Sequence, residues 1–168
     1  SIIVPVLNEA TGLEMFLRQF SRWREEGDEV IVVDGGSDDA SFAIAQLYSE
    51  RVISSVRGRA IQLNAGAQAA SGNILWFVHA DTKIAPGIRD KLIKACSEEH
   101  SWGRFDVAIE DCSTIFRVIE MAMNVRSRIT GIATGDQGIF VRRGWFNRAG
   151  GFRPIALMED IELSKGLR

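Results

Sequence analysis

The sequence is poor in cysteine, in excess positive charge and in long hydrophobic runs. Its two cysteines, Cys96 and Cys112, lie far apart and match neither CxxC nor Cys/His metal spacing, so we expect reduced core thiols in a cytoplasmic protein. The formal net charge is −2, and no stripe of Lys and Arg is interleaved with aromatics, which argues against nucleic acid as a partner. No apolar run is long enough to cross a bilayer, and no signal peptide is visible.

The length of 168 residues suits one domain with a substantial core. Residue 1 opens directly on a strand pattern, and residue 168 falls within a helical pattern that has barely begun. We therefore expect residues 1–168 to form a single domain that is truncated at the C-terminus.

Short β-branched runs alternate with longer amphipathic patterns along the whole chain. Strands are expected at 1–6, 28–34, 51–56, 73–80, 104–109 and 138–143, and helices at 11–23, 37–49, 58–71 (stopped by Gly72), 86–98, 113–129 and from 159 onward. The alternation predicts an α/β fold in which an open, mostly parallel sheet is flanked by helices.

Ligands of such sheets bind beyond the carboxyl ends of the strands, and four consecutive strand ends carry polar groups. These groups are Pro5, Asn8 and Glu9, then Asp34 with a following Gly-Gly-Ser, then Gly58 and Arg59, then His79 and Asp81. Singly, Asp34 can begin an Asx turn, and Asn8 and Glu9 can cap a helix. Together they favour a ligand-binding crevice.

The first turn reads "PVLNEATG", which is not the GxGxxG of a dinucleotide site, and no Walker A motif is present. A bound phosphate would then be neutralised by a divalent cation, Mn²⁺ or Mg²⁺, held by carboxylate. His79 and Asp81 lie two apart in an expected strand, so we expect both to face one ligand. Asp81 suits such a metal, whereas His79 can bind it or donate to a phosphate. The alternatives are a histidine bonded to backbone and an aspartate that caps the next helix.

A second acidic focus lies in "MEDIEL" near the end of the chain. Asp160 occupies an expected helix N-cap, directly after Glu159. An acid held there can keep one oxygen facing the crevice, as a general base requires.

Four segments together resemble the family 2 glycosyltransferases of the GT-A fold, and more narrowly a bacterial subgroup of small enzymes. They are "SIIVPVLNE", "VIVVDGGSDD", "GRAIQLNAGAQAASGNILWFVHADT" and "GDQGIFVRRGWFNRAGGFRP" with "MEDIEL". The sequence departs from the family at His79, because the usual Asp-x-Asp is here His-Ala-Asp. This departure puts the metal affinity and the nucleotide identity in question.

The resemblance implies a role for each candidate residue. The expected nucleotide-sugar contacts are Pro5, Asn8, Glu9, Asp34, Arg59, Asn64, His79, Gly135 and Asp136. The resemblance also implies that Asp81, with His79, binds the metal, and that Asp160 of the Glu159–Asp160 pair is the catalytic base.

The implied reaction is an inverting transfer of sugar from a nucleoside-diphosphate sugar to an acceptor hydroxyl. Two alternatives stay open: a catalytically silent module that binds nucleotide sugars, and a nucleotidyltransferase built on a related sheet. The wide apolar face expected at 113–129 would meet a lipid-linked acceptor, a membrane surface at its inner face or a second copy. The alternatives are that the helix is buried on both sides or is covered by the missing C-terminal segment.

Overall fold

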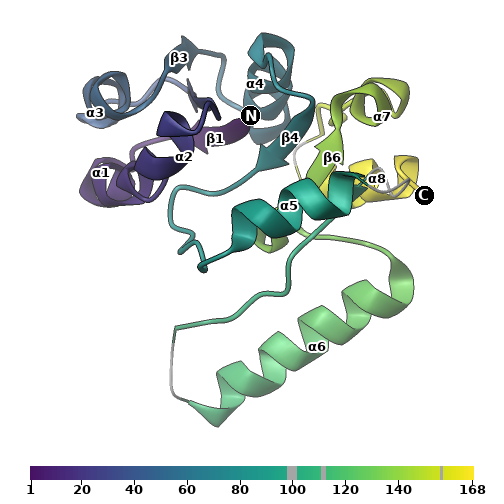
Figure 1. Ribbon diagram of the computed structural model, residues 1–168. Helices are drawn as coiled ribbons and strands as arrows, with labels where there is room; N and C mark the ends of the chain where they lie inside the picture. The colour runs from purple at the N-terminus through teal and green to yellow at the C-terminus, as the bar shows by residue number, and fades with distance from the viewer. Residues whose placement is uncertain (98–101, 111–112, 156) are drawn as a thin grey trace.

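The computed structural model describes residues 1–97, 102–110, 113–155 and 157–168, and its centre is a six-stranded sheet (Figure 1). The strand order is β3-β2-β1-β4-β6-β5. Strands β1 to β4 pair in parallel, whereas β6 runs antiparallel to both β4 and β5. The strands are β1 (Ile2–Val6), β2 (Val30–Asp34), β3 (Arg51–Ser54), β4 (Ile74–Phe77), β5 (Trp102–Gly103) and β6 (Phe140–Arg142). The predicted α/β class with a mostly parallel sheet is confirmed.

Helices cover both faces of the sheet (Figure 1). They are α1 (Ala10–Arg18), α2 (Ser21–Glu25), α3 (Ser41–Tyr48), α4 (Arg59–Ala69), α5 (Ile88–Ser97), α6 (Thr114–Thr130), α7 (Arg143–Arg148) and α8 (Glu159–Gly166). In β1, the alternation of strand side chains sends Ile2, Val4 and Val6 to a core shared with α1, α3 and α5. Ile3 points to the opposite core, which is shared with α4, α7 and α8. No described helix is both long and apolar enough to cross a bilayer.

The expected strand at 104–109 is wrong, because only Trp102 and Gly103 pair with β6. Beyond Gly103, the amide of Phe105 donates to the carbonyl of Gln137 at 2.7 Å. The backbone then bonds with α6: the amide of Val107 donates to Asn124 Oδ1, and that of Ile109 donates to Glu120. Side chains of a helix therefore take the place of a neighbouring strand.

Three smaller expectations also differ from the structure. The helix expected at 11–23 is interrupted after Arg18, and α7 was not predicted. Helix α4 ends at Ala69 without a left-handed glycine, since Gly72 is not among the residues with positive φ. Cys96 is buried and free as expected, whereas Cys112 lies outside the described residues.

Gly66 allows α4 to approach the sheet closely. A Cβ built on it would lie 2.5 Å from Ile3 Cγ2 and 3.0 Å from Val33 Cγ2. By contrast, nothing lies within 4 Å of a Cβ built on Gly12 in α1. A methyl group added at Gly66 would therefore clash with the sheet, whereas one added at Gly12 would change only the helix propensity.

We predict that Gly66→Ala lowers the free energy of unfolding by about 1–3 kcal/mol, because it overpacks the core. Gly12→Ala is expected to raise it by up to about 1 kcal/mol, because alanine favours the helix. Urea denaturation followed by circular dichroism measures both. Equal effects of the two substitutions would contradict the close approach at Gly66.

Candidate functional site at the carboxyl edge of the sheet

The end of β2 is a tight turn organised by Asp34. The side chain is buried, and its Oδ2 accepts the backbone amides of Gly36 and Ser37, both at 3.0 Å. The Ser37 hydroxyl donates to the other carboxylate oxygen. The alternative that Asp34 begins an Asx turn is therefore confirmed. The contact of Asp34 with a nucleotide stays a prediction.

The turns that follow β1 and β2 are hydrogen-bonded to each other. Asn8 has a φ of 57°; its Oδ1 accepts the amide of Asp38 at 2.8 Å, and its own amide donates to Ser37 Oγ at 2.9 Å. Asp39 accepts the amide of Ala10 at 3.0 Å. The expectation that Asn8 and Glu9 cap the next helix is thus wrong: Glu9 lies at the N-cap of α1, but its exposed side chain makes no capping bond.

Gln62 of α4 fixes the spacing between β1 and β2 at this edge, and sequence reasoning missed it. Its buried amide nitrogen donates to the carbonyls of Val6 at 3.0 Å and Val33 at 2.9 Å. Pro5 lies within β1 rather than after it, opposite Val33. A glutamine between Ile61 and Leu63 in the helix pattern was the available signal, but it does not say which backbone groups are bonded.

His79 and Asp81 follow β4 in a turn, not in the strand itself. Strand β4 ends at Phe77, and the amide of Thr82 donates to the carbonyl of His79 at 3.2 Å. The prediction that His79 and Asp81 lie in a strand is therefore wrong. Ala80 between them is buried, whereas His79 is half-buried and Asp81 is exposed. Both side chains nevertheless line one cavity.

Arg59 connects this turn to α8. Its Nε lies 3.1 Å from Oε1 of Glu159, which is only 5% exposed, and its Nη2 contacts His79 Nε2. Burial, and then the charge of Arg59, lower the pKa of His79, against the opposing effect of nearby acids. The imidazole is therefore neutral at neutral pH, with its Nε2 accepting a hydrogen bond from the guanidinium.

Gly135 provides the space through which Arg59 reaches His79. A Cβ at Gly135 would lie 1.7 Å from Arg59 Nη2 and 2.7 Å from His79 Nε2. Its amide donates to Asp160 Oδ2 at 2.6 Å. The structure thus brings Arg59, His79, Gly135, Glu159 and Asp160 together around one small pocket.

Asp160 is the second residue of α8, so its predicted N-cap position is wrong. The N-cap is Met158, which has a φ of 67°. The second oxygen of Asp160, Oδ1, accepts the amide of Ile161 at 2.7 Å. These two bonds to backbone amides orient the carboxylate toward the short helix η1 (Gly135–Gln137).

Asn64 is engaged elsewhere. Its amide nitrogen donates to the carbonyl of Phe152 at 2.7 Å, and its Oδ1 accepts the amide of the same residue at 2.9 Å. The pair of bonds holds the turn after α7 onto α4. Both the nitrogen and the oxygen of the Asn64 amide are thus bonded to Phe152. The contact of Asn64 with the nucleotide sugar stays a prediction.

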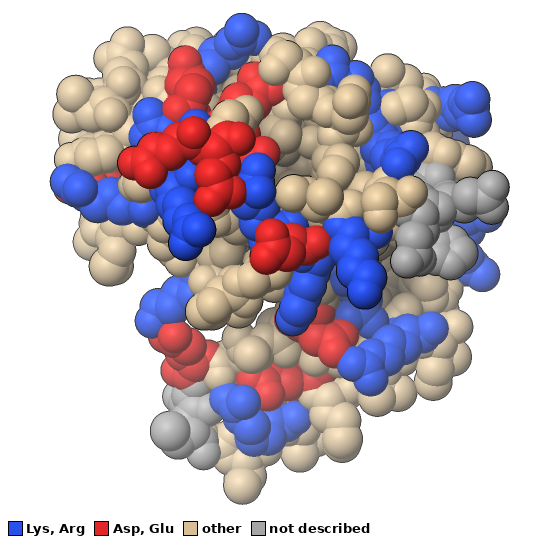
Figure 2. Space-filling model, viewed as in Figure 1, with Lys and Arg blue, Asp and Glu red and all other residues tan. Residues whose placement is uncertain are grey.

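A cavity of about 510 Å³ opens beside His79. Figure 2 shows the molecule hollowed between the sheet and the segment that carries α6. Polar groups line one side of this cavity: His79, Asp81, Asp136 and Gln137. Thr82, Lys83, Asp106 and Glu110 line it too. Among the remaining lining residues, the large apolar ones are Trp76, Val78, Ile84, Ile88, Phe105, Val107, Ile109 and Met123.

The described residues contain no preassembled group of three or more acidic, histidine or cysteine side chains that could hold a metal. Asp81 is exposed on the cavity, and the neutral His79 and the exposed Asp136 line it too. One or two such ligands suit Mg²⁺ or Mn²⁺ when substrate phosphates supply the rest. The donor set therefore fits a metal that binds together with a diphosphate.

The fold is similar to that of solved GT-A glycosyltransferases. A mannosyltransferase from Pyrobaculum calidifontis, solved with GDP-mannose and Mn²⁺, has a TM-score of 0.71 and 22% identity, covering 97% of this chain and 49% of that one. Glucosyl-3-phosphoglycerate synthase from Mycobacterium tuberculosis, solved with Mn²⁺ and UDP, has a TM-score of 0.68 and 21% identity, covering 96% and 61%.

The model of glycosyl transferase family 2 matches residues 1–154, so the chain belongs to that family. A PGL/p-HBAD biosynthesis glycosyltransferase of Mycobacterium bovis is 31% identical over 89% of this chain and 61% of its own length. An undecaprenyl-phosphate 4-deoxy-4-formamido-L-arabinose transferase of Pseudomonas syringae is 27% identical over 84% and 46%. The chain spans about half the length of the curated relatives it matches.

We predict that Gly135→Ala weakens binding of a nucleoside diphosphate at least about tenfold, because the new methyl group displaces the Arg59 guanidinium. The matched control is Gly144→Ala in α7, where a Cβ meets nothing within 4 Å. Isothermal titration of GDP and UDP measures the difference. Unchanged affinity in Gly135→Ala would show that the Arg59–His79 contact is irrelevant to binding.

Proposed function

We propose that this domain transfers a sugar from a nucleoside-diphosphate sugar to an acceptor hydroxyl with inversion at the anomeric carbon. The observation that carries the proposal is the convergence of Asp160, Arg59 and His79 at the carboxyl edge of a family 2 fold. Solved proteins of the same fold hold GDP-mannose or UDP with Mn²⁺.

The donor is proposed to lie across the carboxyl ends of β1, β2 and β4. Pro5, Asn8, Glu9 and Asp34 would surround the base and ribose, where the interlocked turns give a fixed surface. The diphosphate would lie near Arg59, whose charge can stabilise a leaving diphosphate. Gly135 and Asp136 would lie beside the donor sugar.

Asp81 is proposed to hold the divalent cation, with His79 as a second ligand. When bound, such a cation neutralises the charge that develops on a departing diphosphate. Arg59 already contacts His79 Nε2, so metal binding by that nitrogen would require the guanidinium to move. Until it moves, His79 orients Arg59 instead.

Asp160 is proposed as the general base that removes the proton of the acceptor hydroxyl. Two backbone amides fix its carboxylate, and each oxygen retains capacity to accept a further hydrogen bond. The buried Glu159 is the counterion of Arg59, which supports a positioning role rather than one as a second base. No covalent intermediate is needed for inversion.

The acceptor is proposed to bind in the cavity between the β4–α5 connection and α6, next to Asp136. A lipid-linked acceptor suits its largely apolar walls, and one relative is an undecaprenyl-phosphate transferase. Such an acceptor would place the enzyme at the cytoplasmic face of a membrane.

We predict that Asp160→Asn reduces the release of nucleoside diphosphate from UDP-glucose or GDP-mannose, with Mn²⁺ present, by about 10²–10⁴-fold while donor binding persists. The amide oxygen can still accept the Gly135 amide, whereas the amide NH2 cannot accept that of Ile161, so basicity and one of the two orienting bonds are lost together. The matched control is Glu162→Gln, an acid of the same helix that pairs with Lys165.

Turnover in Asp160→Asn equal to that of the parent protein would refute the assigned base. Donor binding without any turnover in the parent protein would favour the silent binding module. Release of pyrophosphate from a nucleoside triphosphate would favour nucleotidyl transfer.

A further inference from the structure

Helix α6 extends away from the sheet, beneath the rest of the molecule in Figure 1. None of its residues belongs to either hydrophobic core. Its contacts run instead to the irregular segment that follows β5, at residues 104–110. The helix is therefore held by polar bonds at one side rather than by apolar packing.

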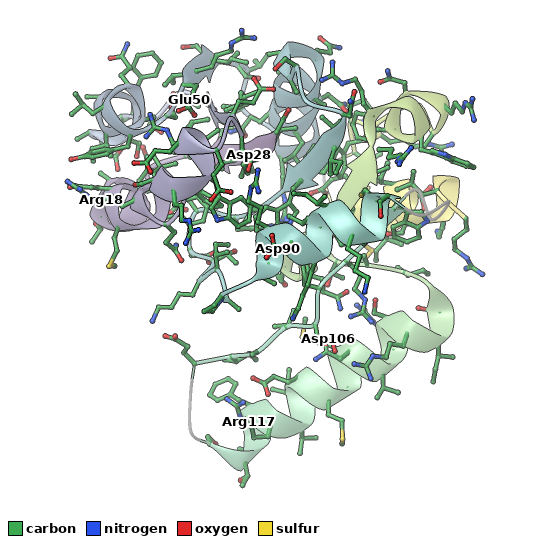
Figure 3. All side chains as sticks on the ribbon, in the orientation of Figure 1. Arg18, Asp28, Glu50, Asp90, Asp106 and Arg117 are labelled. Carbon is green, nitrogen blue, oxygen red and sulfur yellow. The ribbon has the colours of Figure 1, made fainter. Side chains whose placement is uncertain are left out.

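The side of α6 that faces the protein is polar. Asn124 bonds both ways with the backbone of Val107, at 3.0 Å in each direction, and Glu120 accepts the amide of Ile109. Arg117, on the same helix, pairs with Glu120 at 2.9 Å, and Figure 3 shows Arg117 and Asp106 near opposite ends of this interface. These bonds fix the rotation of the helix about its axis.

Because the rotation is fixed, an apolar face is turned outward. Its large side chains are 40–79% exposed; they are Ile115, Val118, Ile119, Met121, Val125 and Ile129. At helical spacing they form a continuous stripe from Ile115 to Ile129, along nearly the whole helix. The alternative of a helix buried on both sides does not hold for the described residues.

The charges on α6 indicate what covers this stripe. Glu120 is the single acid of the helix, and it is buried on the inward side. Arg126 lies on the outward side, seven residues after Ile119, and has no ion-pair partner among the described residues. Arg128, paired with Asp106, lies at the border of the stripe.

We propose that the outer face of α6 is a docking surface for a membrane that contains anionic lipids. An apolar stripe bordered by arginines lies in the bilayer interface, with the aliphatic stems in the acyl boundary and the guanidinium groups at lipid phosphates. A second copy of the chain fits less well, since its own α6 face offers Arg126 no acid. The docked helix would also bring the cavity, which Met123 of α6 lines, to the lipid surface.

The test is co-sedimentation of the purified protein with phosphatidylcholine vesicles, with and without roughly a third phosphatidylglycerol. We expect binding at least about tenfold tighter to the anionic vesicles, and a loss of at least about tenfold in the double variant Val118→Glu/Ile129→Glu. Leu47→Glu on α3 is the matched control, because Leu47 is 75% exposed outside this face. Arg126→Gln should reduce the preference for anionic vesicles.

Absence of binding to either vesicle, or equal loss in Leu47→Glu, would overturn the proposal. A dimer by light scattering that only the double variant dissociates would instead assign the face to a second copy, which also overturns it. Circular dichroism confirms that each variant is folded. The vesicle experiment contains no donor, so its outcome is independent of the proposed sugar transfer.

Discussion

The arrangement of the site depends on the ion pair between Arg59 and Glu159. A buried carboxylate is costly unless it is paired, and Glu159 finds its partner at the first turn of α4. The pair ties α8 to α4 on the same face of the sheet. It therefore places Asp160 beside Gly135 and directs the Arg59 guanidinium at His79.

This constraint also bears on residue 79, where the sequence has histidine. A second carboxylate at position 79 would face Arg59 directly and form a strong salt bridge with it. The neutral imidazole instead accepts a hydrogen bond from the guanidinium without compensating its positive charge. The histidine thus contacts the cationic side of the site, and its binding of a metal stays a prediction.

Much of this structure could be predicted from the sequence, because the apolar strand runs and the ends of the strands are local signals. The sheet class and the position of Arg59 and His79 at one edge follow from such signals, whereas the approach of Asp160 depends on how α8 packs. The bonds of Gln62 to the ends of β1 and β2 depend on how α4 packs on the sheet, and no local sequence pattern predicts that packing. The segment at 104–109 was misjudged because its partners are side chains of α6, so its strand-like pattern had no strand to pair with.

We propose that the carboxyl edge binds a nucleoside diphosphate together with a divalent cation held by Asp81. The most direct measurement is calorimetric titration of GDP and UDP into the protein and into Asp81→Asn, with and without Mn²⁺. The account predicts binding of at least one nucleotide that requires Mn²⁺ in the parent protein and is lost in Asp81→Asn. Binding that is equally tight without metal, or unaffected by Asp81→Asn, would contradict it.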